Sequence, residues 1–330
     1  MKTDSQTINR NFMAKLAAGD KQGAMDAGTE FTRLTLREEG LLRKILPPRT
    51  ISYGDLDKQL DTDKPVKILD KEVGQPPSFS APFGSLPPNQ YISGGRYKVN
   101  FARLLSRNYT KDVAELNQYD YDIRDLFKDN AIKDHMTAED IPAFQLFNQI
   151  IQSDPADYVA VGNTASAMTG KVQFHDYTQA SGNPRGYTGF SRDSLVDSFT
   201  IMTKGYGDNT VGTRIKLMTD LCVMNINTGL EFLKLLPTEI GERIADKCAT
   251  DGLAMDNFFG RRFLFTIKDE VVEDGAMYMF SKPEFLGAFL ELESPTLFLE
   301  NRAYMMEFFI YSMIGMSVGN GYGIAKSLFF

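Results

Sequence analysis

The chain has 330 residues, enough for one large domain or two of ordinary size, and its 42% hydrophobic fraction is enough for a core. With 36 basic and 43 acidic residues the formal net charge is −7, which argues against a dedicated nucleic-acid-binding protein. An aromatic fraction of 12% argues against disorder, and two cysteines are too few for a disulfide framework, so we expect a reducing compartment. The sequence shows no signal peptide, transmembrane run or fixed-period repeat.

The first third of the chain predicts an arm followed by a long extended loop. Residues 1–28 favour a mobile arm or a weak helix, and 29–46 favour a short helix that ends at two prolines. Strand-like pieces at Val66–Leu69 and Tyr91–Arg107 then flank a tip, Gly74–Asn89, that contains five prolines. A loop of roughly fifty residues is uncommon inside a compact domain and usually acts outside it.

Charge separates sharply after this loop. Eleven acids and only three bases lie between Asp112 and Asp157. The segment just before them, residues 96–111, contains five basic residues and no acidic residue. The five are Arg96, Lys98, Arg103, Arg107 and Lys111. One interpretation is two solvated faces of opposite sign. The other is a basic arm that lies on the acidic segment of another subunit. Complementary electrostatic fields of this kind steer the association of two subunits and set the register of their contact. The second interpretation proposes the five bases as intersubunit contacts.

The acidic segment has the pattern of helices. Leu116–Asp134 carries apolar residues in helical phase. A second helix is expected to begin at Asp140 as its N-cap, with Pro142 in its first turn. This pattern predicts a helix boundary near the proline. Tyr158–Gly189, rich in Gly, Ser, Thr and Asn, is expected to form loops or a hairpin.

From Phe190 onward, short helices and strands follow one another without the regular order of a βαβ series, which favours an α+β fold. Helices are expected after the N-cap Ser191, at Thr228–Leu236 and after Pro237, and strands at Arg214–Met224, Arg262–Ile267 and Ala276–Phe280.

The chain closes with Thr296–Phe330. Its stretch Tyr304–Met316 is apolar at almost every position, whereas a strand with one face in water would alternate. We therefore expect a closing strand that is covered on both faces, by packing within or between subunits. The alternating glycines Gly319, Gly321 and Gly323 fit a turn better than a nucleotide-binding loop.

No motif predicts a catalytic or metal site. His135 and His175 stand alone in polar stretches, and we interpret both as surface histidines. Cys222 and Cys248 lie in apolar patterns and are interpreted as buried, inert thiols. Gly170-Lys171 lacks the spacing of a phosphate-binding loop. We expect no catalytic residue, no metal, no cofactor and no enzymatic activity.

The order of the parts carries a resemblance that no single motif carries. Between and around the long loop and the helical stretch stand, in order, Thr29–Leu34, Ile45–Pro48, Phe190–Val196, Leu221–Asn225, Thr228–Leu235, Asn301–Arg302 and Gly321–Ala325. Over nearly the whole chain, this order resembles the major capsid proteins of tailed double-stranded DNA bacteriophages, which have the Hong Kong 97-type fold.

The resemblance implies an α+β chain with five parts. They are an N-terminal arm at 1–48, an extended loop at 49–110 that reaches over a neighbouring subunit, a peripheral domain with a long spine helix at 111–189, a mainly axial domain at 190–295, and a terminal strand at 296–330 that returns to the peripheral domain. Pro142 departs from the family pattern, because a continuous spine helix would be interrupted or would start there.

The resemblance also implies partners. The chain would assemble with itself, as hexamers and pentamers, into an icosahedral virion shell in the host cytoplasm, with portal and scaffold proteins and no membrane; a decoration protein is left open. Packaged DNA would be contacted non-specifically through the basic residues Arg33, Arg37, Arg43, Lys44 and Arg49.

Two details of assembly follow from comparison with the family pattern. The few residues before the first structured element predict a separate scaffold or none, and the tip without lysine predicts assembly without covalent cross-links. Two alternatives stay open: an encapsulin-like cellular compartment, which shares the fold, and a soluble α+β enzyme, for which the sequence offers no convergent ionisable groups.

Overall fold

A computed structural model describes most of the chain from residue 38 onward. The described residues are 38–60, 63–72, 82–84, 94–112, 115, 123–151, 174–178, 188–203, 217–235, 257–258, 260–302 and 305–330. The chain forms two compact units, each described by itself below. Unit 1 consists of Met1–Leu41, Ala102–Glu139 and Glu291–Ile314, and unit 2 of Leu42–Phe101, Asp140–Leu290 and Gly315–Phe330.

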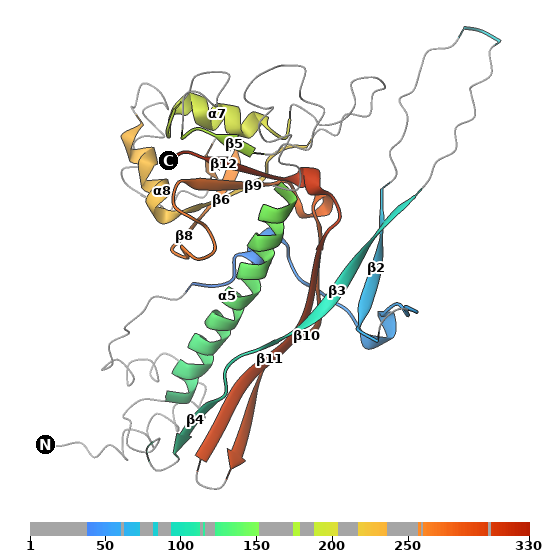
Figure 1. Cartoon of the computed structure of the whole chain (residues 1–330), viewed down its shortest axis with the longest axis vertical. Coiled ribbons are helices and arrows are strands. Elements are labelled where there is room, and N and C mark those ends of the chain that lie inside the picture. The colour runs from blue at the N-terminus through green and yellow to red at the C-terminus, as the bar shows by residue number, and fades with distance from the viewer. Residues whose placement is uncertain are drawn as a thin grey trace, which may run out of the picture. The chain divides into compact units, whose positions relative to one another are not determined.

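One sheet has the strand order β1-β10-β11-β3-β2, with β4 paired to β11. Its long members β10, β11 and β3 run side by side in Figure 1 and continue from one unit into the other. The bounds are β1 Arg49–Thr50, β2 Val66–Lys71, β3 Gly95–Leu105, β4 Tyr109–Asp112, β10 Gly287–Arg302 and β11 Met305–Val318.

In unit 1, helix α5 (Ile123–Ile151) packs on one face of β11. The contact joins His135 Nε2 to Ser312 Oγ over 2.6 Å, and both side chains are buried. Ile310 and Ile314 share the strand parity of Ser312 and are also buried. Ile310, Ser312 and Ile314 of the even-numbered face of β11 therefore belong to the core of this unit, and Met313 of the odd-numbered face is buried as well.

Unit 2 contains a second sheet, in the order β5-β12-β9-β6-β8-β7. Its two central strands, β6 and β9, are buried at all five of their positions, which explains their continuous apolar sequences. β6 runs parallel to β8 and antiparallel to β9. The bounds are β5 Phe174–Asp176, β6 Leu221–Asn225, β7 Asn257–Phe258, β8 Arg261–Thr266, β9 Ala276–Phe280 and β12 Ile324–Leu328.

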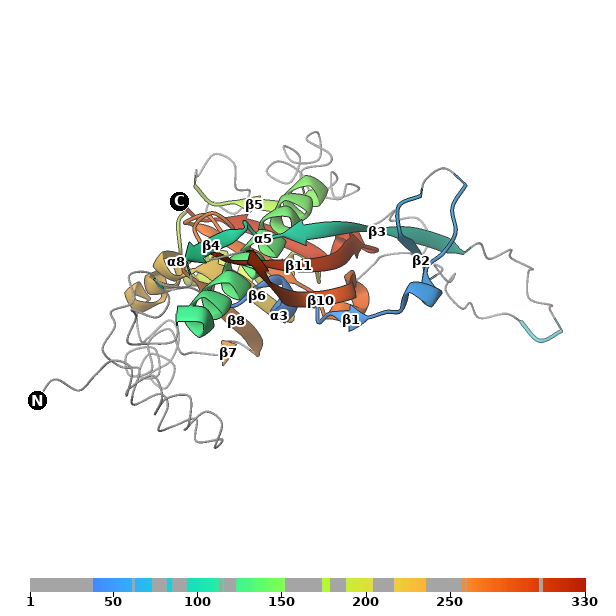
Figure 2. The same cartoon turned by 90° about the horizontal axis from the view of Figure 1, so that it is seen from below.

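Helices cover both faces of this second sheet. Helix α7 (Arg192–Thr200) contributes Leu195 and Phe199 to the core cluster on one face. On the other face, Phe144 of α5 contacts the rings of Tyr278 and Phe280 edge-on. Figure 2 gives a second view of these elements. Shorter helices are α3 (Leu42–Ile45) and α8 (Ile226–Leu230), with 3-10 turns at Tyr53–Asp55, Glu231–Lys234, Pro283–Phe285 and Gly321–Gly323.

Several expected elements are confirmed. Ser191 caps α7 through a capping box, in which its side chain accepts from the backbone N–H of Ser194. Strands β8 and β9 lie where the sequence predicts them, and β6 begins at Leu221, later than expected. The expected helix at Thr228–Leu236 is replaced by α8 and a 3-10 turn. The arm at 1–28 and the helix after Pro237 lie outside the described residues.

The predicted helix boundary at Pro142 is wrong. Helix α5 runs without interruption from Ile123 to Ile151, with the proline inside it. Asp140 is not an N-cap, because its buried carboxylate accepts the backbone N–H of Leu42 and pairs with Lys268, each over 2.8 Å. A proline there removes one helical hydrogen bond, and the tertiary packing of the following aromatic residues offsets that loss.

The expectation of one closing strand also needs correction. Thr296 belongs to β10, which forms a hairpin with β11. After a 3-10 turn capped by Asn320, which confirms the expected turn, β12 enters the second sheet between β5 and β9. The double burial of β11 is incomplete, because Phe309 and Tyr311 on its odd-numbered face are only half-buried.

Candidate assembly surfaces

The predicted basic arm begins on a hairpin of β2 and β3. The two strands pair antiparallel, with Asp70 opposite Arg96. Val99 and Phe101 are buried, whereas Arg96 and Lys98, which alternate with them, are exposed. The alternation read from the sequence therefore places these two cations on the solvent face of β3.

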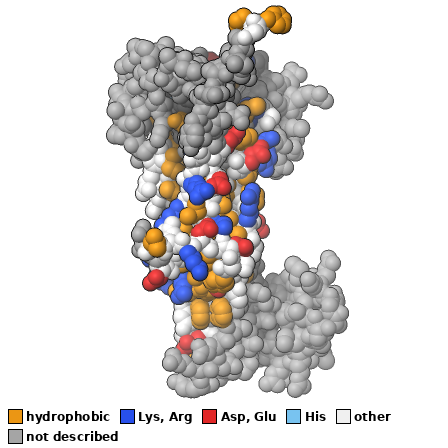
Figure 3. Space-filling model, turned by 90° about the vertical axis from the view of Figure 1, so that its right-hand side faces the viewer, with side chains coloured by type: hydrophobic (Ala, Val, Ile, Leu, Met, Phe, Trp, Pro, Cys, Tyr) orange, Lys and Arg blue, Asp and Glu red, His pale blue; other side chains and the backbone are white. Residues whose placement is uncertain are grey.

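Both cations have partners on the same hairpin or the loop before it. Arg96 Nε donates to Asp70 Oδ1 over 3.0 Å, and Lys98 Nζ donates to Gln59 Oε1 over 2.6 Å. The Arg96 and Asp70 side chains are 75% and 84% exposed, so this ion pair contributes little to stability. Figure 3 shows basic side chains interspersed with acidic ones on one face of the described residues. This surface has mixed charge.

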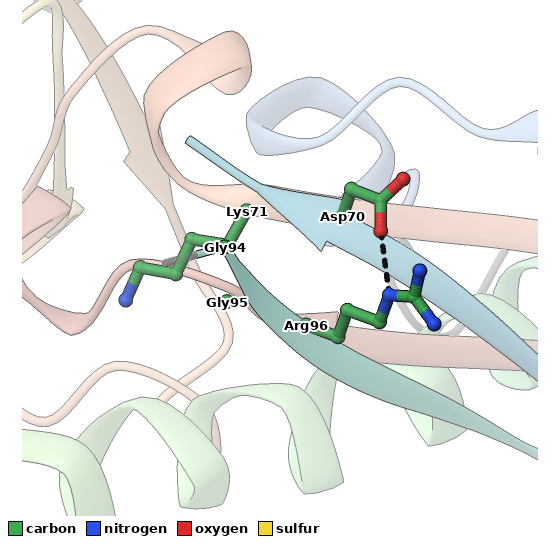
Figure 4. Close-up of a pocket in the computed structure, with 5 residues that line it drawn as sticks. All are labelled: Asp70, Lys71, Gly94, Gly95 and Arg96. Carbon is green, nitrogen blue, oxygen red and sulfur yellow. Dashed lines mark hydrogen bonds and ion pairs between the residues drawn. The ribbon is translucent and has the colours of Figure 1, made fainter. Parts of the chain in front are cut away.

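An open hollow of about 590 Å³ lies at the end of this hairpin. Figure 4 shows the Arg96 guanidinium turned toward Asp70, while the Lys71 side chain extends away from both. Gly94 and Gly95 complete the lining. These five residues include one carboxylate and no histidine or cysteine, so the lining offers a polar surface without the convergent groups of a catalytic pocket.

The outer edge of β2 is partly blocked by Asp57. Its backbone N–H donates to Val66 O over 2.9 Å, and its carboxylate accepts the backbone N–H of Ile68 over 2.7 Å. The bond from Ile68 lowers the pKa of Asp57, and the neighbouring Lys67 acts in the same direction. Because β2 ends the sheet, these contacts cover edge groups that could otherwise pair with another strand.

The other three predicted contact residues lie in unit 1. Arg103 lies near the end of the long strand β3 and interacts with Tyr311 of β11. Arg107 is exposed in the turn before β4. Lys111 on β4 is half-buried and forms an ion pair with Glu115 over 2.5 Å. Arg96 and Lys98 belong to unit 2, whereas Arg103, Arg107 and Lys111 belong to unit 1.

The acidic segment is described at 112, 115 and 123–151. Two of its acids, Glu139 and Asp140, are buried at 1% and 0% exposure. Asp140 is paired with Lys268 inside unit 2. Neither carboxylate is therefore available to a basic arm, and only the remaining acids of the segment can serve as partners.

The sequence analysis missed an aromatic patch on unit 1, which we define as Phe298, Phe309 and Tyr311. The rings of Phe298 and Phe309 stack with centroids 5.4 Å apart, and Tyr311 meets Phe298 at 6.3 Å. Partial burial and Glu293 raise the pKa of Tyr311, whereas Arg103 acts in the opposite direction. The signal for this patch was the presence of apolar residues on both parities of β11, from which the sequence predicted cover of both faces within or between subunits but no particular surface.

The interpretation of both histidines as surface residues is wrong. His135 is 3% exposed and bonded to Ser312, as described above. The His175 side chain is 12% exposed, and its Nδ1 lies 2.8 Å from the Tyr177 hydroxyl and 3.4 Å from Asp197 Oδ2. Their partners are distant in sequence or belong to another element, so local polarity did not reveal the burial.

Cys222 is buried, as predicted, and desolvation raises the pKa of its thiol. Cys248, Gly170-Lys171, Arg33 and Arg37 lie outside the described residues. Where the structure is described, no group of three or more histidine, cysteine or acidic side chains is placed to hold a metal ion. No helix among the described residues is long and apolar enough to cross a membrane.

The amino-acid sequence matches no protein-family model and no curated protein. Solved structures are similar in fold. The capsid of cyanophage P-SCSP1u aligns with a TM-score of 0.62 at 11% identity, over 91% of each chain. The capsid of cyanophage Pam1 gives 0.56 at 8% identity, over 91% of this chain and 94% of the other. The capsid of a native gene transfer agent particle gives 0.53 at 14% identity, over 96% and 98%.

These likenesses show the fold at nearly full length. The chain has an α+β fold of the Hong Kong 97 type, and its described residues form two sheets, a long helix and the antiparallel pair of β2 and β3. The fold expected from the sequence is confirmed.

Proposed function

We propose that this chain is the major capsid protein of a tailed phage and that its copies assemble into an icosahedral shell around double-stranded DNA. The observation that carries this proposal is the whole-chain likeness to a phage capsid, over 91% of both chains. A shell protein acts through extended surfaces and needs no catalytic centre, which agrees with the structural, non-enzymatic character of the solved relatives. Closed symmetry then makes the particle from identical contacts.

The parts of the fold have proposed roles in such a shell. Residues 49–110 would form the extended loop, which the antiparallel pairing of β2 and β3 supports. Helix α5 would be the spine helix of the peripheral domain, 29 residues or about 43 Å long. The sheet of β6, β8 and β9 would form the centre of the axial domain, within 190–295.

The proposed contacts between copies remain the five cations, in two groups. Arg96 and Lys98 would act from the β2–β3 hairpin, and Arg103, Arg107 and Lys111 from unit 1. Their partners would be exposed acids of a neighbouring copy. Surface charge pairs of this kind set register and association rate, and salt weakens them.

Further partners are proposed from the same likeness. Copies would form hexamers and pentamers in the host cytoplasm, with portal and scaffold proteins and without covalent cross-links. Exposed Lys44 and Arg49 are the described members of the basic group proposed to contact DNA. Arg43 lies over the ring of Phe289 at 5.6 Å, which favours a structural role for its guanidinium.

Assembly of the purified chain tests the proposal. Sedimentation velocity and electron microscopy, with and without a scaffold, should show closed particles that protect double-stranded DNA when packaged. A chain that stays monomeric under every assembly condition would overturn the proposal. Particles that enclose a cargo protein in place of DNA would favour a cellular compartment.

Charge reversal tests the proposed contacts. Arg103→Glu/Arg107→Glu should impair assembly at low salt more than it lowers the unfolding temperature of the free subunit. Lys234→Glu/Lys282→Glu is a matched control, because it reverses two exposed lysines outside the proposed contacts. Equal assembly of the wild type and the arginine variant at low salt would show that the arginines are not contacts.

A further inference from the structure

A buried polar cluster joins the edge strand β5 to helix α7 in unit 2. It consists of His175 on β5, Tyr177 directly after that strand, and Asp197 on α7. The His175 and Asp197 side chains are 12% and 6% exposed, and Tyr177 is 1% exposed. The cluster lies on the α7 face of the second sheet, because Ser327, the register partner of His175 on β12, bonds to Ser198 of α7 over 2.8 Å. An imidazole that can change its charge therefore lies between sheet and helix, largely out of water.

The hydrogen bonds of the cluster determine where its protons lie. The Tyr177 hydroxyl donates to Asp197 Oδ2 over 3.2 Å, so its oxygen is left to accept. His175 Nδ1 lies 2.8 Å from that oxygen and therefore carries the hydrogen that it donates. The same nitrogen lies 3.4 Å from Asp197 Oδ2, which is the distance of an ion pair when the imidazole is protonated. Uptake of a second proton at Nε2 leaves these bonds in place and adds a positive charge beside the carboxylate.

Two effects act on the charged imidazole in opposite directions. Burial disfavours the charged form, whereas a carboxylate within about 4–6 Å favours it. The carboxylate has the larger effect here, because Asp197 is itself largely buried and water screens the pair only weakly. The protonated form of His175 is therefore the one that holds β5 and α7 together more firmly.

Four other charged groups on the surrounding elements lie away from His175. Two are exposed on α7, one has the opposite parity on β5, and one lies on the opposite face of β12 and pairs with Glu273; they are, in that order, Arg192, Asp193, Asp176 and Lys326. Within the part of unit 2 that the structure describes, Tyr177 and Asp197 are the titratable groups placed against the imidazole.

We propose that this cluster is a pH-dependent latch, which holds α7 on the edge of the second sheet more firmly when His175 is protonated. β5 is three residues long and ends the sheet, so its side-chain bonds to α7 matter for its position. The stability that the latch contributes is fully present below the ordinary histidine pKa of about 6.5. It is lost as the pH rises through the titration of His175 in the folded chain. The latch belongs to unit 2 of a single copy and does not depend on the shell function.

NMR of the imidazole protons in the unassembled subunit is the first test. The chain has two histidines, so the signal that is missing in His175→Asn belongs to His175. We expect this signal to titrate about one pH unit above the ordinary midpoint of about 6.5, because the imidazole pairs with Asp197. A midpoint at or below the ordinary one would overturn the proposal, since the folded unit would then disfavour the charged form.

Hydrogen exchange of the α7 amides is the second test. After correction for intrinsic exchange rates, protection of α7 relative to β6 should be about tenfold larger at about pH 5.5 than at about pH 8.5, because one pH unit corresponds to a tenfold change in the opening equilibrium. His175→Asn keeps a donor near the position of Nδ1 but cannot take up a charge, so this dependence should disappear. The same dependence in the wild type and in His175→Asn would overturn the proposal.

Removal of the carboxylate tests the cause of the shift. Asp197→Asn should lower the NMR midpoint of His175 by about one pH unit, because the imidazolium loses its partner. Glu273→Gln is the matched control. It neutralises another acid of unit 2, which pairs with Lys326 on the opposite face of the sheet, and should leave the midpoint unchanged. Equal shifts in the two variants would mean that net charge, and no local pair, sets the titration, and the latch would be refuted. The wild-type exchange profile needs no variant and decides the matter if Asp197→Asn does not fold.

Discussion

Replacement of Lys268 by methionine should strongly destabilise unit 2. Lys268 Nζ lies 2.8 Å from Asp140 Oδ2, and the two side chains are 6% and 0% exposed. The other carboxylate oxygen accepts the backbone N–H of Leu42 over 2.8 Å, which anchors the start of α3. Methionine keeps the volume of the lysine stem and removes the ammonium. The change therefore leaves a buried carboxylate without its cationic partner.

The size of the expected destabilisation follows from the loss of the cation beside the buried Asp140 carboxylate. Removal of one member of a buried ion pair costs about 3–5 kcal/mol, because the remaining charge stays out of water. Lys326→Met is the matched control. Lys326 is also buried, but its partner Glu273 is 56% exposed and keeps its hydration when the pair is broken. We expect a cost of about 1 kcal/mol there, as for ion pairs with access to solvent.

Urea unfolding of the unassembled subunit measures both costs as changes in midpoint at constant slope. Asp140→Asn in the Lys268→Met background should recover part of the loss, since the stranded charge is then removed. A cost of Lys268→Met no larger than that of Lys326→Met would refute the reasoning. It would mean that water or a rearranged chain reaches Asp140.

Three further outcomes are expected. Gly315→Ala should lower the free energy of unfolding by about 1–3 kcal/mol, because a Cβ there would lie 2.9–3.0 Å from atoms of β3. Gly54→Ala is the control and should be tolerated, because a Cβ there would meet the Ser52 side-chain oxygen at 3.9 Å. Equal effects of the two changes would contradict the close packing at Gly315. The pKa of Asp57 is lowered, so its carboxylate bond to the Ile68 N–H is present at neutral pH and is lost only as the pH falls below the ordinary value of 3.8. Acid should therefore speed hydrogen exchange at the Ile68 amide relative to neighbouring β2 amides. Asp57→Asn should abolish that dependence on pH. Burial raises the pKa of Cys222, so this thiol should resist alkylation, measured by mass spectrometry, until the chain unfolds; rapid labelling of the native chain would show that the strand is accessible.

Local patterns predicted the elements that local forces determine. The alternation of charged and apolar residues located β3, and the capping signal at Ser191 located α7. The continuous apolar runs at β6 and β9 predicted strands, and the structure buries both completely. In each case, residues within one element carry the information.

The misses depend on partners far away in the sequence. Asp140 looked like a helix cap because its ion pair with Lys268 joins residues 128 positions apart. His135 looked like a surface residue because Ser312 is 177 positions away. Without a map of contacts, a buried polar group cannot be distinguished from a solvated one. The order of the strands in each sheet was unpredictable for the same reason.

The two faces of β11 show how a sequence can carry information about an assembly. A strand that is apolar at both parities needs cover on both sides. Within one copy, Ile310 and Ser312 receive that cover, whereas Phe309 and Tyr311 remain half-buried beside the exposed Phe298. A contiguous exposed apolar patch on a soluble protein usually marks an interaction site. The odd-numbered face of β11 at Phe309 and Tyr311, together with Phe298, is therefore the apolar surface of unit 1 that one copy leaves without full cover.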